Sequence, residues 1–92
     1  MSEETVSKLK QDLVNLKEHL KQERDEIKLQ LHLLKKEAKG EWDGFEQNWE
    51  VFVNKVDQTV KEFSDEVAIT AKDVGEKLKS GYENIKRDWK DN

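Results

Sequence analysis

Two histidines and many carboxylates are the residues of this chain that could bind a metal or move protons. His19 and His32 lie 13 positions apart, and neither has a second histidine four positions away or a glutamate three positions before it. Helical zinc and di-iron sites use those spacings, because residues three or four apart share one face of a helix. We therefore expect no metal site and no cofactor.

The other patterns of catalytic residues are also incomplete. Most carboxylates have a lysine or arginine at a helical-neighbour spacing, as Asp73 has Lys77, which is typical of a solvated helix face. The segment Gly40–Gly44 lacks the Lys-Ser/Thr that follows a phosphate-binding loop, and Ser64 lacks the glycines of a nucleophile elbow. The sequence predicts a protein that is not an enzyme.

Composition indicates one small helical domain over residues 1–92. The chain has no proline and no cysteine, and 41% of its residues are charged against 34% that are hydrophobic. Acidic residues outnumber basic ones by 21 to 17, for a net charge of −4, and both signs are spread along the chain. Nucleic acid is therefore not an expected partner, since its binding requires a basic surface.

The spacing of the apolar residues predicts long helices. Val6, Leu13, Leu20, Ile27 and Leu34 recur every seven residues, whereas the companion column Leu9, Leu16 becomes polar at Glu23 and Gln30. An eleven-residue period follows, which suits a nearly straight helix. Its three columns are Ile27, Ala38, Trp49, Val60, Ala71, Tyr82; Leu34, Phe45, Val56, Val67, Leu78, Trp89; and Gln30, Glu41, Phe52, Phe63, Val74, Ile85.

A pair of glycines in the middle of the chain suggests a turn. Gly40 and Gly44 flank Asp43, and glycine is the usual residue just past a helix end. Lysines precede the pair and acidic residues follow it, as the helix dipole favours at a C-terminus and an N-terminus. We therefore expect helices over about 3–39 and 43–91, with a turn at about 40–43 shaped by Gly40, Asp43 and Gly44.

This arrangement is an all-α long helical hairpin, an antiparallel coiled coil. The eleven-residue phase runs through the glycines without a slip, so one continuous long helix in an oligomer is the alternative. Two helices alone would leave part of a wide apolar stripe in water, and pairing of two hairpins into a four-helix bundle would cover it. The residues expected to carry self-association are Trp49, Phe52, Val56, Phe63 and Val67.

Two known kinds of protein resemble parts of the chain. Glu41–Phe45, Val74–Leu78 and Tyr82–Lys86 are similar to the eleven-residue units of small bacterial coiled-coil proteins described as stress-associated, which share their repeat with late-embryogenesis-abundant and apolipoprotein-like helices. This resemblance implies a non-enzymatic helical protein with a stress-related role.

Trp42-Asp43-Gly44 resembles the central turn of the Trp-x-Gly helical hairpins that type VII secretion systems export. Those proteins also carry Tyr-x-x-x-Asp/Glu near the C-terminus, whereas here Tyr82 is followed four residues later by Lys86. This second resemblance implies a secreted adaptor.

The function expected from these observations is a structural or interaction module that forms a homo-oligomer, most simply a dimer. An amphipathic protein that lies on a membrane surface or protects other molecules is the alternative, because aromatic residues and lysines alternate in the second half of the chain. The N-terminal residues show no signal-peptide pattern, so the expected location is cytoplasmic.

Overall fold

The computed structural model describes the backbone of residues 2–90 and the side chains of residues 2–87. It contains three long helices: α1 (Glu3–Leu29), α2 (Lys36–Lys61) and α3 (Asp65–Lys90). One short 3-10 turn, η1 (Leu31–Leu33), lies between α1 and α2. The predicted all-α fold is confirmed. The predicted two-helix hairpin and its one-helix alternative are both wrong, because the chain reverses twice.

Helix α1 begins with a side-chain cap. The Ser2 hydroxyl accepts a hydrogen bond from the Thr5 amide at 3.2 Å, and Glu3 and Glu4 place negative charge in the first turn. A capping oxygen and acidic residues both stabilise a helix N-terminus, where four amides have no intrahelical partner. The sequence-predicted start of this helix at residue 3 is therefore confirmed.

The first reversal occupies residues 30–35, about ten residues before the predicted turn. The Gln30 amide donates to the Ile27 carbonyl at 2.9 Å and closes α1. Leu34 then adopts an extended conformation and its side chain is buried. Leu34 belongs to the apolar core of the chain, and the partly buried Leu31 packs against that core.

The predicted turn at residues 40–43 is wrong. Gly40, Asp43 and Gly44 lie inside α2, and no residue in the described part of the chain has a positive φ. Neither glycine has a neighbouring atom within 4 Å of where a Cβ would stand, so both lie on an open helix surface. Packing decides the outcome here, because burial of Trp42 on the same helix outweighs the cost of about 1 kcal/mol for each helical glycine.

The second reversal divides the helix predicted over residues 43–91. Helix α2 ends at Lys61, where the Glu62 amide donates to the Gln58 carbonyl at 2.8 Å, and α3 begins at Asp65. Asp65 and Glu66 supply the acidic first turn of α3. Folding back at this point covers the apolar stripe of α2 from within the same chain. The predicted end at residue 91 and the side chain of Trp89 lie outside the described part.

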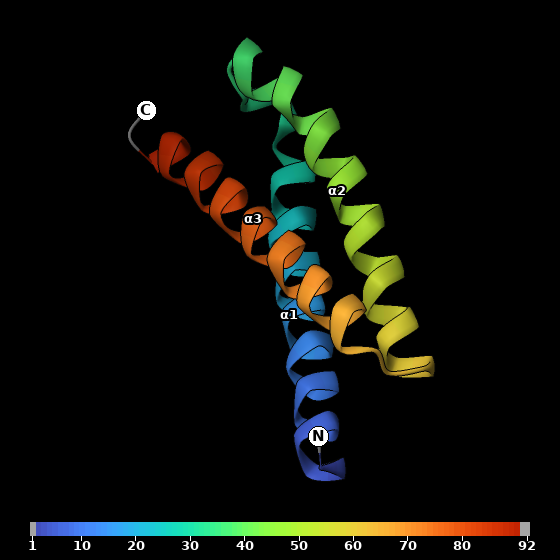
Figure 1. Cartoon of the computed structure of the whole chain (residues 1–92). Coiled ribbons are helices and arrows are strands. Elements are labelled where there is room, and N and C mark those ends of the chain that lie inside the picture. Colours follow the sequence, from blue (N-terminus) through green and yellow to red (C-terminus); the bar gives the residue numbers. More distant parts are fainter. Residues whose placement is uncertain (1, 91–92) are drawn as a thin grey trace.

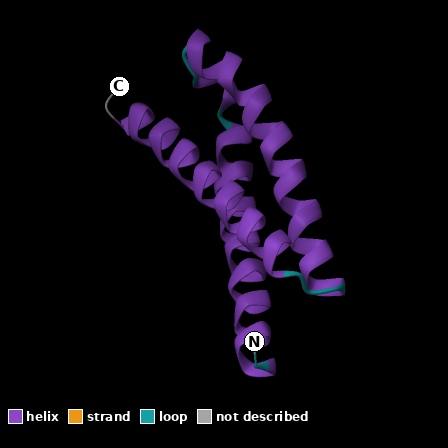
Figure 2. Cartoon of the chain, in the orientation of Figure 1, coloured by secondary structure: helices purple, strands orange, loops and turns teal. Residues whose placement is uncertain are grey.

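Helices α1 and α2 run antiparallel, and α3 crosses both at an angle (Figure 1). The two short connections lie at opposite ends of α2 (Figure 2). The first turns of α1, near the N-terminus, extend past the link between α2 and α3 (Figure 1). The molecule is therefore elongated, with principal extents of 48 × 20 × 17 Å.

One apolar core joins the three helices. Its fully buried side chains follow the sequence columns, with Leu20 and Ile27 from α1, Phe52 and Val56 from α2, and Ala71, Leu78 and Tyr82 from α3. Gly75 and Gly81 allow α3 to approach α2 closely. A Cβ at Gly75 would lie 2.7 Å from the Phe52 ring, and one at Gly81 would lie 2.6 Å from the Phe45 ring.

Candidate functional site

The histidines do not come together in a site. His19 Nε2 lies 2.5 Å from Glu23 Oε1, one helical turn along α1, whereas His32 is exposed in η1. The described residues contain no group of three or more His, Cys, Asp or Glu side chains placed to hold a metal ion. The acidic and basic groups of this chain instead form pairs that connect helices.

The first of these pairs connects α1 to α2. Arg24 donates two hydrogen bonds to the Glu46 carboxylate, each 2.7 Å long, and its guanidinium lies 5.4 Å from the centroid of the Trp49 ring. Hydrogen bonding to Glu46 raises the pKa of Arg24, so the group stays cationic at any ordinary pH. A forked pair of this kind fixes orientation as well as distance.

The second pair connects α1 to α3. Lys86 Nζ lies 2.6 Å from Glu26 Oε2 and 3.9 Å from the more buried Glu23 carboxylate. Hydrogen bonding from Lys86 lowers the pKa of Glu26, which therefore stays ionised at neutral pH. Glu23 occupies a core position of the heptad, and His19 and Lys86 together supply its polar contacts.

Among the described residues, Tyr82 has the most strongly shifted pKa. Its ring is fully buried, 6.0 Å between centroids from both Trp42 and Phe45. Its hydroxyl has no hydrogen-bond partner among the described residues. Burial, and then the nearby Glu46 charge, raise the pKa of Tyr82 far above its ordinary value. Full burial among aromatic rings makes Tyr82 a core residue.

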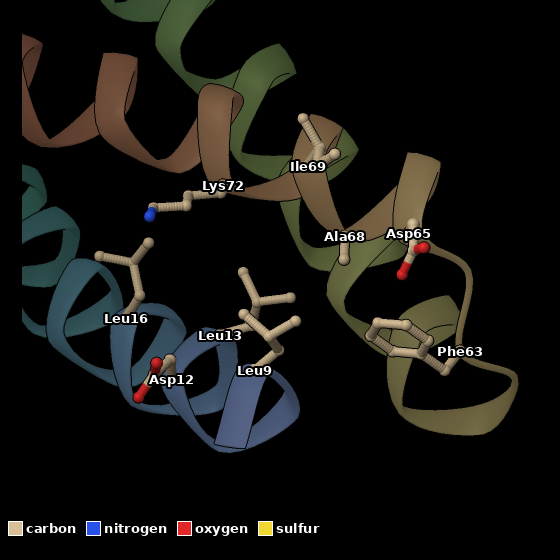
Figure 3. A pocket seen from close by; sticks show the side chains of 9 residues that line it. All are labelled: Leu9, Asp12, Leu13, Leu16, Phe63, Asp65, Ala68, Ile69 and Lys72. Atoms are coloured by element: carbon tan, nitrogen blue, oxygen red, sulfur yellow. The ribbon is translucent and has the colours of Figure 1, made fainter. Parts of the chain in front are cut away.

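An apolar hollow between α1 and α3 is the clearest candidate for a binding site (Figure 3). It has a volume of about 360 Å³, and its apolar walls are Leu9, Leu13 and Leu16 from α1, Phe63 from the link, and Ala68 and Ile69 from α3. It forms where α3 crosses α1 at an angle, so the two helices diverge toward their N-terminal ends (Figure 1). Apolar walls open to solvent suit a helix or an apolar side chain of a partner.

The rim of this hollow carries charges of both signs. Asp12 lies on α1, and Asp65 and Lys72 lie on α3; all three side chains are exposed. Within the described side chains, none of the three belongs to an ion pair of this chain. Ile69 is 63% exposed and projects from α3 away from the leucines of α1 (Figure 3). An exposed isoleucine therefore stands directly beside an open apolar hollow.

A second hollow, between α1 and α2, has a different character. Three valines, Val14, Val56 and Val60, line it together with five charged residues. Lys17 Nζ and Asp57 Oδ1 lie 3.3 Å apart across it. This hollow is already bridged by an ion pair, so the one between α1 and α3 is the better candidate.

The five residues predicted to carry self-association lie in different places. Phe52 and Val56 are buried within the single chain, so they are not free to form an interface in this state. Trp49 packs against Phe52 at 6.0 Å between ring centroids, and Val67 is half-buried. Only Phe63 lines the hollow.

Sequence reasoning missed the leucines of the hollow and Ile69. The signal that could have found Ile69 is its position, because it belongs to none of the three eleven-residue columns yet is a large apolar residue.

Comparison with protein families, with curated proteins and with solved structures finds no match to this chain. No helix among the described residues is both long and apolar enough to cross a membrane.

Proposed function

We propose that this protein is a non-catalytic helical module that self-associates, and that the hollow between α1 and α3 is its interface. In this proposal two copies meet about a two-fold axis, and Ile69 of each copy enters the hollow of the other. The observation that carries the proposal is that the exposed side chain of Ile69 lies at the edge of the open apolar hollow that it helps to line. Such a surface complements itself, as a two-fold interface requires.

The apolar part of the surface supports this pairing. Leu9, Leu13 and Leu16 offer the hole, and Ile69 leaves 63% of its surface in water in the single chain. Transfer of apolar surface out of water is favourable at about 25 cal/mol per Å². The patch is smaller than the roughly 1,200 Å² typical of stable interfaces, so we expect a weak dimer whose population depends on concentration.

The charges on the rim support the same partner. Asp12, Asp65 and Lys72 all lie on the rim of the hollow in one chain. In the proposed dimer, Lys72 of one copy faces Asp12 and Asp65 of the other, and the two-fold axis repeats these pairs. These charges have no ion-pair partner among the described side chains, so no existing ion pair has to break when two copies bind. Opposite charges at a rim favour the correct orientation and suppress others. An anionic lipid surface would face two carboxylates for one lysine, which disfavours it.

Sedimentation velocity over about a hundredfold range of concentration tests the proposal, because mass action links association to concentration. The wild-type protein should shift from monomer toward dimer, and Ile69→Glu should remain monomeric over the same range. Val51→Glu is the matched control: Val51 is 44% exposed on α2, outside the hollow. Equal association of Ile69→Glu and the wild type, or loss of association in the control alone, would contradict the proposal.

A further inference from the structure

The first reversal, at one end of the molecule (Figure 1), holds two large apolar side chains in water. Leu29 is 79% exposed at the end of α1, and Leu33 is 61% exposed at the end of η1. Leu31 and Leu34, from the same stretch, already attach the reversal to the core. The exposed pair therefore has no packing role within the chain.

Lysines flank these leucines, although the chain as a whole carries a net charge of −4. Of the five Lys, Arg, Asp and Glu residues between positions 28 and 39, four are lysines: Lys28, Lys35, Lys36 and Lys39. All four are exposed, and none forms an ion pair with another described side chain. The preceding acids of α1, Asp25 and Glu26, are paired with Arg24 and Lys86. This end of an acidic molecule is therefore locally cationic.

Three of these lysines lie where helix stability disfavours them. Lys35 is the N-cap of α2 and makes no side-chain cap, and Lys36 and Lys39 lie in its first four residues. An N-cap prefers a short side chain with an oxygen acceptor, and the helix dipole disfavours cations at this end. The stability of α2 therefore does not explain these charges.

A shallow hollow between η1 and α2 brings the apolar and basic groups together. Its volume is about 260 Å³, and Leu31, His32, Lys39 and Trp42 line it. Apolar surface and groups that can carry positive charge are thus open to solvent at the same place.

We infer that this end of the molecule, residues 28–39, binds the surface of an anionic membrane. Leu29 and Leu33 enter the boundary between headgroups and acyl chains, and the four lysines contact the anionic groups of the lipids. Exposed apolar side chains beside clustered lysines are the combination that such a surface attracts. The leucines supply the apolar contact, and the lysines select anionic over neutral lipid.

The size of this end favours a lipid surface over a folded protein. The two short dimensions of the molecule are 20 and 17 Å, so its end face is much smaller than the roughly 800 Å² that each partner gives to a standard protein interface. A lipid surface requires only a few inserted side chains and nearby cations.

The inference goes beyond the proposed self-association and uses a different surface. The hollow between α1 and α3 begins at Leu9, near the opposite end of α1. Its rim has two carboxylates for one lysine, whereas the first reversal has four lysines for one glutamate. Either proposal can therefore fail while the other holds.

Co-sedimentation with vesicles tests the inference. The probes are phosphatidylcholine vesicles with and without about one third phosphatidylserine, at low and high salt. The full chain should bind the anionic vesicles at low salt, and binding should weaken as salt rises. Neutral vesicles should bind it at least about tenfold more weakly, because they do not attract the lysines.

The lysines are tested by Lys35→Glu with Lys36→Glu. Acidic residues at the start of α2 agree with the helix dipole, so this variant should fold. It should bind anionic vesicles at least about 25-fold more weakly, since each lysine near the surface contributes roughly fivefold. The matched control is Lys77→Glu with Lys79→Glu, a pair of exposed lysines on α3, which should lose much less.

The leucines are tested by Leu29→Ser with Leu33→Ser. Because both side chains are exposed in the free protein, the variant should keep its stability and lose at least about tenfold in vesicle binding. The matched control is Val51→Ser with Val60→Ser, which removes two half-exposed apolar side chains from α2 and should bind as the wild type does. Circular dichroism spectra check that all four variants remain helical.

A polarity-sensitive fluorophore identifies the end that meets the lipid. The chain has no cysteine, so the label can be placed at Gln30→Cys or at Asn48→Cys, both exposed. We expect a blue shift on anionic vesicles for the label at position 30 and none at position 48. Absence of vesicle binding, equal binding of the lysine variant and its control, or a blue shift only at position 48 would overturn the inference. Full binding by the leucine variant would also overturn it, because attraction of lysines to any polyanion would then suffice.

Discussion

Four glycines in this chain have two opposite roles. Gly40 and Gly44 have no atom near the position of a Cβ, whereas Gly75 and Gly81 lie under aromatic rings of α2. The first two are helix residues with a conformational cost and no packing use, since glycine loses more freedom than alanine in a helix. The last two set how closely α2 and α3 approach.

Gly44→Ala should stabilise the protein by about 0.5–1 kcal/mol, because the methyl group enters open space and restricts the unfolded chain. Gly75→Ala should destabilise it by about 1–3 kcal/mol, because the added Cβ would meet both the Phe52 ring and Leu16. Urea unfolding measures both free energies. Equal stability of Gly75→Ala and the wild type would show that the two helices are not in this close contact.

The ring of Tyr82 packs in the core, whereas its buried hydroxyl has no hydrogen-bond partner among the described residues. The Tyr82→Phe variant should be as stable as the wild type or more stable by up to about 2 kcal/mol, because it removes a buried polar group that lacks a partner. Chemical denaturation at neutral pH measures this difference. A clear loss of stability would mean that the hydroxyl has a hydrogen-bond partner in solution.

The pH dependence of Tyr82 has a definite sign. Its folded-state pKa is raised above the unfolded value of about 10, so the unfolded state loses the proton first as pH rises. The contribution of Tyr82 to the free energy of unfolding is therefore fully present below a pH of about 10 and is lost as the pH rises above it. The stability of Tyr82→Phe should fall less steeply in alkaline solution than that of the wild type. Parallel alkaline limbs for the two proteins would refute this assignment.

At the scale of the helices, the sequence predicted the helical content and the buried helix faces better than it predicted where each helix ends. The absence of proline and the seven- and eleven-residue columns indicated an all-helical chain, and Leu20, Ile27 and Phe52 are buried as their columns require. The turn was misplaced because glycines are strong local signals, whereas burial of Trp42 keeps this stretch helical.

The second reversal had a weak local signal. Ser64, Asp65 and Glu66 have the composition of a helix start, with a capping residue followed by two acids. The continuous eleven-residue phase concealed this start, since it favoured one long helix. Only the crossing of α3 over α1 creates the hollow, so its residues could not be grouped from spacing along the chain.

Hydrogen exchange distinguishes the observed first reversal from the glycine turn. Amides of Asp43 and Gly44, inside α2, should exchange slowly. Those of Lys36 and Glu37, in its first turn, should exchange quickly, because first-turn amides have no intrahelical acceptor. Residue-resolved exchange by nuclear magnetic resonance measures both. Fast exchange at Gly44 together with slow exchange at Lys36 would show that the first turn of the chain lies at the glycines.

At the scale of the whole molecule, two copies must bring unlike charges together at the rim of the hollow. Lys72→Asp alone should weaken the dimer, because Asp12 and Asp65 of one copy would then face a third carboxylate on the other copy. A mixture of Lys72→Asp with the double variant Asp12→Lys and Asp65→Lys should form mixed dimers better than either variant forms its own. Sedimentation of the separate and mixed proteins gives the comparison. If the mixed dimer is not preferred, the rim charges do not lie in the interface.

The central claim is that Ile69 of one copy enters the hollow of another. Isotope-filtered nuclear Overhauser measurements on a mixture of labelled and unlabelled chains, at a concentration where the protein is dimeric, observe only contacts between copies. The account predicts contacts between the Ile69 methyl groups of one chain and the methyl groups of Leu9, Leu13 or Leu16 of the other. A dimer without these contacts would contradict the account and place the interface elsewhere on the molecule.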